Sequence, residues 1–178
     1  MHNTPLCCAV TAVPAQRQHS SRLVYVAHDS SAQTQRAPIF LERFKSLVPA
    51  YLDEQWTPQE GFRSSELAAA LADSELEPHI HLPQALEEFY LALGRCEEIM
   101  EAYHFFFDPE ELVVEEGHLL FLEDEDERWA WGVDVDTLDV PDPLIRRRSN
   151  AHERWTDENA TVSEFIFDLL EFSFEEEA

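Results

Sequence analysis

The chain has 178 residues, 44% of them hydrophobic and 11% aromatic, which is enough for one domain with a buried core. The formal net charge is −25, with five basic and two acidic groups in residues 1–50 but seven basic and 35 acidic groups in residues 51–178. Such a field repels nucleic acids and anionic membranes, which excludes both as expected partners, and it attracts basic proteins. General solubility is the alternative explanation of the charge.

Cysteine usage and hydropathy predict a cytoplasmic protein. The three cysteines include an adjacent pair and no CxxC motif, a sparse and odd count that is typical of a reducing compartment. The N-terminus has no apolar segment after a basic start, and the chain has no run of 18 apolar residues.

Helical patterns dominate the first half of the chain. Residues 1–36 are rich in polar residues without periodicity, so we expect a flexible N-terminal tail. Apolar residues then recur at helical spacing and predict a helix over Ile39–Leu52. Alanines favour a second helix over Glu66–Ala72, capped by one of the two serines before it.

The third predicted helix follows Pro83, which the first helical turn tolerates. It has one apolar stripe, with Glu87 and Glu88 outside it, and Gly94 can end it in a left-handed conformation. Residues 95–107 are expected to form a turn that leads into a strand. Their apolar members are expected to be buried: Met100, Tyr103 and Phe105–Phe107.

Short apolar runs then predict an antiparallel meander. The expected strands are Leu112–Glu115, His118–Leu122, Trp129–Asp134 and a short Leu144-Ile145. Within the third strand the two tryptophans share one face, which is expected to pack under a helix. A neighbouring backbone can approach Gly132 on the other face.

A last helix begins at a capping box, with Thr161 as N-cap and Glu164 three residues later. The order of helices, meander and closing helix predicts an α+β fold. In this fold, helices pack around a mostly antiparallel sheet, as a single domain over residues 37–178.

Five acids, Glu123–Glu127, lie between two strands and predict a β-hairpin with an acidic tip. The only basic cluster, Arg146–Arg148, has the composition of a phosphate site. In so acidic a chain it is expected to pair with nearby acids such as Asp142 or Glu153.

Motifs for catalysis or metal binding are weak. The DVDTLD segment from Asp134 lacks the glycine and the glutamate of an EF-hand loop, and the pair His79 and His81 lacks a third ligand at suitable spacing. No GxSxG motif or glycine-rich phosphate loop accompanies His104 or His118, so both histidines are expected to serve packing. We therefore expect no enzyme, no catalytic residue, no metal and no cofactor.

Several short motifs in order resemble the SUKH superfamily, the Smi–Knr type domain, over residues 37–178. They are Leu82-Pro83, Leu86-Glu87-Glu88-Phe89-Tyr90, Trp131-Gly132-Val133-Asp134, Asp142-Pro143-Leu144, Trp155 and Ser163-Glu164-Phe165. The resemblance implies an α+β fold without shared catalytic residues. It also implies an immunity protein that binds and neutralises a cognate toxin domain, often a nuclease, whereas eukaryotic relatives act as scaffolds.

The leading hypothesis is therefore an immunity protein that occludes the active site of a basic toxin. The residues expected to contact the toxin are Glu123, Asp124, Glu125, Asp126, Asp134 and Asp136. The two alternatives are a non-catalytic regulatory scaffold and a metal-assisted hydrolase built on the acidic strands.

Overall fold

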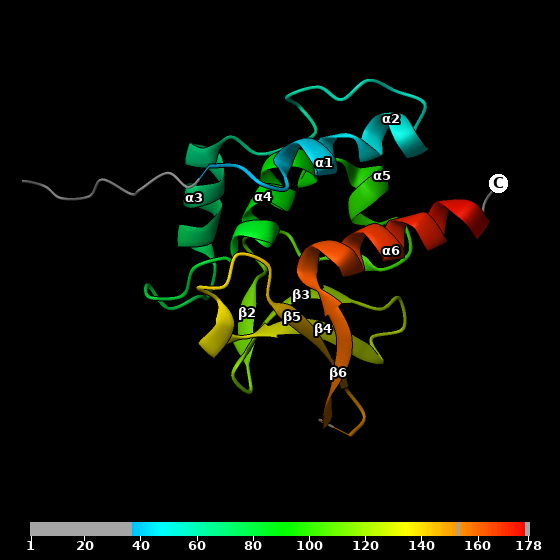
Figure 1. Cartoon of the computed structure of the whole chain (residues 1–178). Coiled ribbons are helices and arrows are strands. Elements are labelled where there is room, and N and C mark those ends of the chain that lie inside the picture. The colour runs from blue at the N-terminus through cyan, green and yellow to red at the C-terminus, as the bar shows by residue number, and fades with distance from the viewer. Residues whose placement is uncertain (1–36, 153, 177–178) are drawn as a thin grey trace, which may run out of the picture. The chain divides into compact units, whose positions relative to one another are not determined.

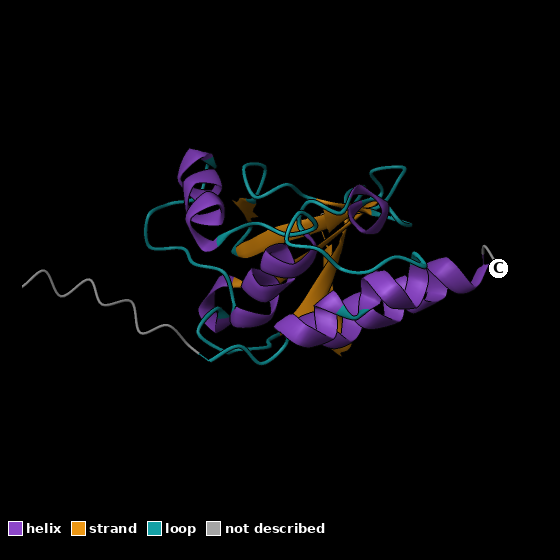
Figure 2. Cartoon of the chain, turned by 90° about the horizontal axis from the view of Figure 1, so that it is seen from above, coloured by secondary structure: helices purple, strands orange, loops and turns teal. Residues whose placement is uncertain are grey.

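A computed structural model describes residues 37–152 and 154–176, and the predicted tail 1–36 lies outside the described residues. The fold is α+β, with the helices gathered on one side of an antiparallel sheet (Figures 1 and 2). The helices are α1 (Leu41–Lys45), α2 (Leu47–Tyr51), α3 (Ser64–Asp73), α4 (Gln84–Leu93), α5 (Glu97–Met100), a short 3-10 turn η1 (Val135–Thr137) and α6 (Val162–Glu176). The strands are β1 (Phe105–Phe106), β2 (Val113–Glu115), β3 (His118–Glu123), β4 (Trp129–Asp134), β5 (Leu144–Ser149) and β6 (Arg154–Thr161).

The predicted helix Ile39–Leu52 is interrupted at Ser46, which separates α1 from α2. Pro49 is the physical reason. It has no N–H to donate to the carbonyl of Lys45, and its ring crowds that carbonyl. The prediction of one continuous helix was therefore wrong, although the apolar residues Phe44, Leu47 and Val48 are buried as the periodicity requires.

A carboxylate from α4 caps α1. Glu88 accepts hydrogen bonds from the backbone N–H groups of Ile39, Phe40 and Leu41 at 2.6–3.1 Å, and Gln84 Nε2 donates to it at 2.6 Å. The first N–H groups of a helix have no partner within the helix, and α1 has no side-chain cap of its own. Glu88 is only 5% exposed, so its predicted place outside the apolar stripe was wrong.

Replacing Glu88 with alanine is expected to lower the free energy of unfolding by about 2–3 kcal/mol, because the loss leaves buried N–H groups without an acceptor. Urea denaturation of Glu88→Ala measures the change. Glu171→Ala, on the exposed side of α6, is the control and should change stability by less than about 0.5 kcal/mol. Equal effects of the two substitutions would contradict the capping role.

The helix ends differ in detail from the sequence prediction. α3 begins after Arg63 rather than after a serine cap, and Glu66 Oε2 accepts from the Arg63 N–H at 2.9 Å. Gly94 follows α4 with φ −63°, so it is not left-handed. Glycine is needed there for space, because a Cβ atom would lie 2.8 Å from the Phe62 ring. The Thr161–Glu164 capping box of α6 is confirmed.

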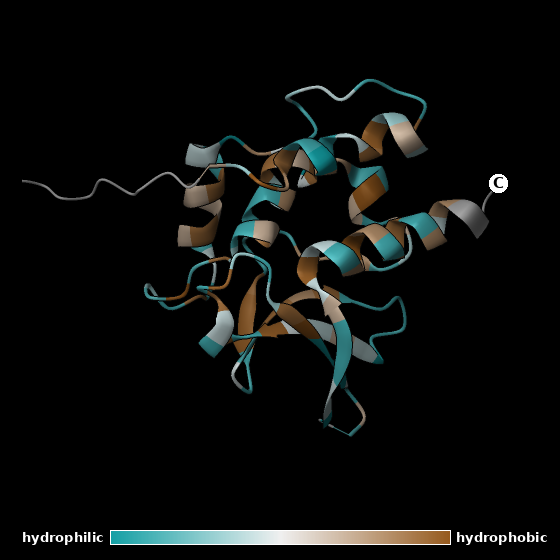
Figure 3. Cartoon of the chain, viewed as in Figure 1, coloured by the Kyte–Doolittle hydropathy of each residue, from teal (hydrophilic) through white to brown (hydrophobic). Residues whose placement is uncertain are grey.

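The sheet order is β1-β3-β4-β5-β6, and β2 also pairs with β3. A bulge at Phe121 separates the pairs Leu120↔Gly132 and Leu122↔Trp131. The predicted approach at Gly132 is confirmed, since a Cβ atom there would lie 2.8 Å from the Leu119 carbonyl oxygen. In Figure 3 the strands in the middle of the sheet are mostly hydrophobic, whereas β6 is mostly hydrophilic.

Strands β5 and β6 are the largest difference from the sequence prediction, which placed only Leu144-Ile145 in a strand. Their arginines and acids carry no apolar alternation, so the sequence has little strand signal there. Cross-strand partners stabilise them instead, because the register pairs Arg146 with Asp157 and Arg147 with Thr156.

Trp131 anchors the sheet under α6. Its side chain is 5% exposed, and its ring lies 4.8 Å from the His104 ring and 5.9 Å from the Phe165 ring, measured between centroids. The predicted burial of this tryptophan under a helix is therefore confirmed. Its Nε1 and His104 Nδ1 are buried without a hydrogen-bond partner among the described residues.

Trp131→Ala is expected to destabilise the domain by roughly 3–5 kcal/mol, because it leaves a large cavity. Trp131→Phe should cost less, since it keeps most of the ring and removes an N–H group that has no acceptor. Thermal and urea denaturation report both changes. If the alanine variant lost less than about 1 kcal/mol, the ring would not be a core element.

Candidate interaction surface

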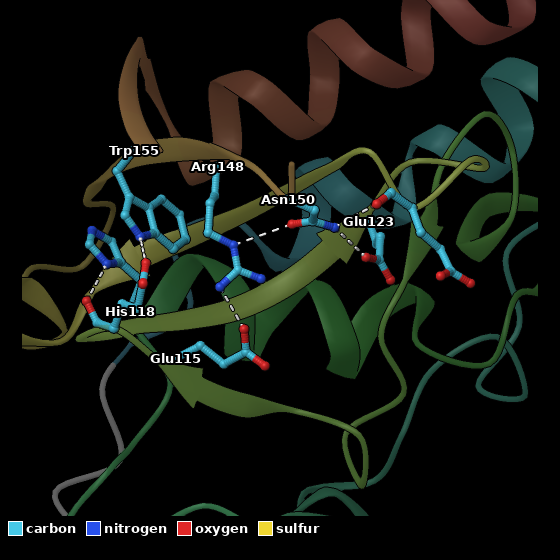
Figure 4. A network of polar contacts seen from close by, with 8 residues as sticks. Glu115, His118, Glu123, Arg148, Asn150 and Trp155 are labelled. Atoms are coloured by element: carbon cyan, nitrogen blue, oxygen red, sulfur yellow. Dashed lines mark hydrogen bonds and ion pairs between the residues drawn. The ribbon is translucent and has the colours of Figure 1, made fainter. Parts of the chain in front are cut away.

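A polar network covers the face of the sheet opposite the helices. Side chains alternate along a strand, and Trp131 contacts α6, so its neighbours Ala130 and Gly132 face away from the helices. Arg148 and Arg146 pair with these two residues in register. We call this side the outer face, and six of its residues are labelled in Figure 4: Glu115, His118, Glu123, Arg148, Asn150 and Trp155.

One chain of hydrogen bonds crosses the outer face from β2 to the hairpin (Figure 4). Glu115 Oε2 accepts from Arg148 Nη1 at 2.6 Å, and Arg148 Nε donates to Asn150 Oδ1 at 3.2 Å. Asn150 Nδ2 then donates to Glu123 Oε1 at 2.9 Å and to the Glu127 carbonyl at 2.7 Å. The network therefore ties the base of the acidic hairpin to β5.

His118 and Trp155 form a second cluster on the same face. Their rings stack at 3.8 Å between centroids, and Trp155 Nε1 donates to Glu116 Oε2 at 3.0 Å. His118 Nδ1 lies 3.0 Å from the Glu116 carbonyl oxygen, and its Nε2 lies 3.5 Å from Arg146 Nη1. The histidine ring is thus held in a packed position.

Each arginine of the basic cluster pairs with a carboxylate, as the acidity of the chain predicts. The distances are 2.9 Å for Arg146–Asp157, 2.9 Å for Arg147–Glu158 and 2.6 Å for Arg148–Glu115. The predicted partner Asp142 instead accepts hydrogen bonds from Ser163 and Thr161, whereas Glu153 lies outside the described residues. The cluster therefore does not present three uncompensated cations to a phosphate.

The acids of the hairpin have different surroundings. Asp124 is 5% exposed, and it accepts from the Trp129 N–H at 2.6 Å, which closes the turn. Asp126 is exposed and pairs with Arg128 at 2.7 Å, and Glu125 is exposed at the tip. Of the predicted contact residues in the hairpin, Glu125 and Asp126 are consequently the two that a partner can reach directly.

The other two predicted contact residues lie at the far end of β4. Asp134 caps η1 by accepting from the Asp136 N–H at 2.9 Å, and Asp136 itself is exposed. The register pairs Asp134 with His118, but it pairs Glu123 with Ala130, four residues earlier in β4. The two acidic groups are therefore separated by at least about 13 Å along the strand and do not form one compact patch.

A shallow depression lies at the Asp134 end of β4, with a volume of about 420 Å³. Its apolar walls include Val140 and Leu144, both exposed, and its polar rim includes Asp134, Arg146 and Asp157.

Three exposed aromatic side chains lie on the edge strand β1, just before it, and on α6. Phe105 in β1 pairs with Glu123 in register, and Tyr103 lies two residues before it. The Tyr103 ring packs edge-on against Phe172 of α6 at 5.4 Å. We call these three residues the aromatic edge, and they are 44–47% exposed. The prediction that Tyr103 and Phe105 are buried was wrong, because β1 is an edge strand whose outer neighbour is solvent.

The two histidines of the predicted His79 and His81 pair contact different carboxylates. His79 pairs with Glu77 at 3.3 Å, and His81 pairs with Asp139 at 3.2 Å. Within residues 37–152 and 154–176, no group of three or more His, Cys, Asp and Glu side chains could hold a metal ion. None of the helices in these ranges combines the length and apolar character needed to cross a membrane.

Comparisons of the chain with protein-family models, with curated proteins and with solved structures find no match. The resemblance to the SUKH superfamily therefore stays a prediction from the residues.

The ionised carboxylate of Glu123 is unfavourable in its partly buried position. Burial raises the pKa of its carboxyl group, and the nearby charges of Glu127 and Asp124 raise it further, whereas the hydrogen bond from Asn150 lowers it. Because the pKa is higher in the folded state, the ionised carboxylate destabilises the fold at neutral pH.

Glu123→Gln should therefore raise the melting temperature at pH 7, because it removes the charge and keeps an acceptor for Asn150. The gain should shrink as the pH falls through the raised pKa of the folded state, and it should vanish below the unfolded value of 4.5, where the wild-type carboxyl group is protonated in both states. Differential scanning calorimetry across this range tests the sign, with the exposed Glu125→Gln as a control for the loss of one charge. A lower melting temperature at pH 7 would contradict the assignment.

Proposed function

We propose that this protein is a cytoplasmic immunity protein that binds a basic toxin domain and neutralises it by covering its active site. The observation that supports the proposal is the hairpin that carries the exposed acids Glu125 and Asp126, because Glu123 at its base pairs in register with Phe105 of the aromatic edge. Nuclease sites are basic because they hold phosphates, so an acidic surface is complementary to them. The proposal requires no catalytic residue, metal or cofactor in this chain.

The two features have different physical roles in such a complex. Most of the binding free energy at protein interfaces comes from a few desolvated side chains, and aromatic residues are prominent among them. Tyr103, Phe105 and Phe172 already expose their rings, so a partner can bury them without unfolding the domain. The acids mainly raise the association rate and select partners of opposite charge.

The six predicted contact residues therefore have different roles. Glu125 and Asp126 are the direct charged contacts of the proposal, and Glu123 supports them at the hairpin base. Asp124 holds the turn that presents them. Asp134 and Asp136 belong to a separate region, which a large toxin domain reaches only if its interface spans the outer face.

Co-expression tests the function. The product of the adjacent gene is produced in a bacterial host with and without this chain, and growth is recorded. We expect the neighbour to arrest growth and this chain to restore it. A harmless neighbour, or arrest that persists with both proteins present, removes the immunity assignment and favours the regulatory scaffold.

Association kinetics with that neighbour test the surface. Glu125→Gln with Asp126→Asn is expected to lower the association rate about tenfold at low salt and to weaken its salt dependence. The matched control, Asp73→Asn with Glu75→Gln, removes the same charge from exposed positions at the end of α3. Stopped-flow fluorescence measures both rates. Identical rates for the two double variants would assign the effect to net charge and not to the hairpin.

A further inference from the structure

A second concave surface lies among the helices α2, α5 and α6, which run close together at one end of the domain in Figure 1. It is a groove of about 680 Å³ and is open to solvent. Its lining consists of Ala50, Tyr51, Leu52, Asp53, Glu98, Glu101, Ala102 and Phe174. The groove therefore combines five apolar or aromatic residues with three acids and contains no basic side chain.

The aromatic part of the groove is a stacked pair. The rings of Tyr51 and Phe174 lie 4.8 Å apart between centroids and are nearly parallel, at 10°. Both side chains are half-buried, so part of this flat surface faces the groove. An arginine guanidinium stacks well on such a surface, and its aliphatic stem adds apolar contact.

The acidic part of the groove lacks compensating cations. The side-chain carboxylates of Asp53 and Glu101 make no hydrogen bond or ion pair with other described residues, and the Glu98 carboxylate accepts only from the Cys96 thiol, at 3.8 Å. All three carboxylates are exposed.

The backbone adds to this negative potential, because all three helices contribute their C-terminal ends. α2 ends at Tyr51, α5 ends at Met100, and Phe174 lies in the last turn of the 15-residue α6. Terminal carbonyl groups lack intrahelical donors, and the C-terminal end of a long helix favours positive charge.

A single metal ion does not suit the groove, because the carboxylates do not form a group that could hold a metal among the described residues. Separated carboxylates around an apolar floor suit a longer occupant whose cations are spaced along a chain. We propose that the groove binds an amphipathic peptide segment of a partner protein, with arginine side chains on the Tyr51–Phe174 pair and near the carboxylates. This inference is independent of the toxin and of the hairpin contact proposed above.

The probe is a fluorescein-labelled octapeptide of alternating leucine and arginine, measured by fluorescence anisotropy with the full chain near physiological salt. Asp53→Asn with Glu98→Gln and Glu101→Gln is expected to weaken its binding about tenfold. The matched control, Asp73→Asn with Glu75→Gln and Glu110→Gln, removes the same charge from exposed positions elsewhere and should weaken binding less than about twofold. Equal losses in the two variants would overturn the proposal, because they would show attraction to the net charge alone.

Two further readouts test the apolar floor. A serine-arginine octapeptide of the same charge should bind at least about tenfold more weakly than the leucine-arginine peptide. Binding should also shift the aromatic NMR resonances of Tyr51 and Phe174. Equal affinity for the two peptides, or unchanged resonances at saturation, would overturn the groove as the site. The hairpin variant Glu125→Gln with Asp126→Asn should leave peptide affinity within about twofold, which separates this surface from the hairpin.

Discussion

The burial of α4 is the interaction on which the rest of the domain depends. Eight of its ten residues are buried, so it packs against its surroundings on nearly every side. Its polar groups bind the segments around it: Glu88 caps α1, Tyr90 Oη donates to the Phe107 carbonyl at 2.7 Å, and the Ala92 carbonyl accepts from Trp56 Nε1 at 2.8 Å. Each bond joins α4 to a different segment, so helix packing and the position of β1 depend on the same ten residues.

Electrostatic repulsion is the opposing constraint. Between residues 37 and 178 the chain has nine lysines and arginines against 36 acids. Seven of these nine cations form ion pairs with carboxylates in the described structure, and the three arginines of β5 are all among them. Because the fold uses its cations internally, most acids are left uncompensated at the surface. The negative field is thus a property of the folded domain and is available to partners of opposite charge.

Two surfaces combine this field with exposed apolar area, and they differ in shape. The acidic hairpin follows β3, which pairs with Phe105 of the aromatic edge, and a hairpin tip suits insertion into a concave basic site. The groove among α2, α5 and α6 is concave and suits an extended basic segment. Tyr103 follows the groove residue Ala102 in the chain, whereas Phe172 and Phe174 are two positions apart in α6 and lie on different sides of that helix.

Local patterns in the sequence determined the fold class, the helix α4, the strands β2 to β4 and the capping box of α6, because periodicity and capping act over a few residues. Tertiary structure alone decided the burial of Glu88, because the backbone N–H groups that it caps lie 47 or more residues away. It also decided the strands β5 and β6, which cross-strand ion pairs stabilise without an apolar pattern, and the exposure of Tyr103 and Phe105 at a sheet edge. The sequence showed how many acids the chain has, but only strand register and hydrogen bonding separated the structural Asp124 from the accessible Glu125 and Asp126.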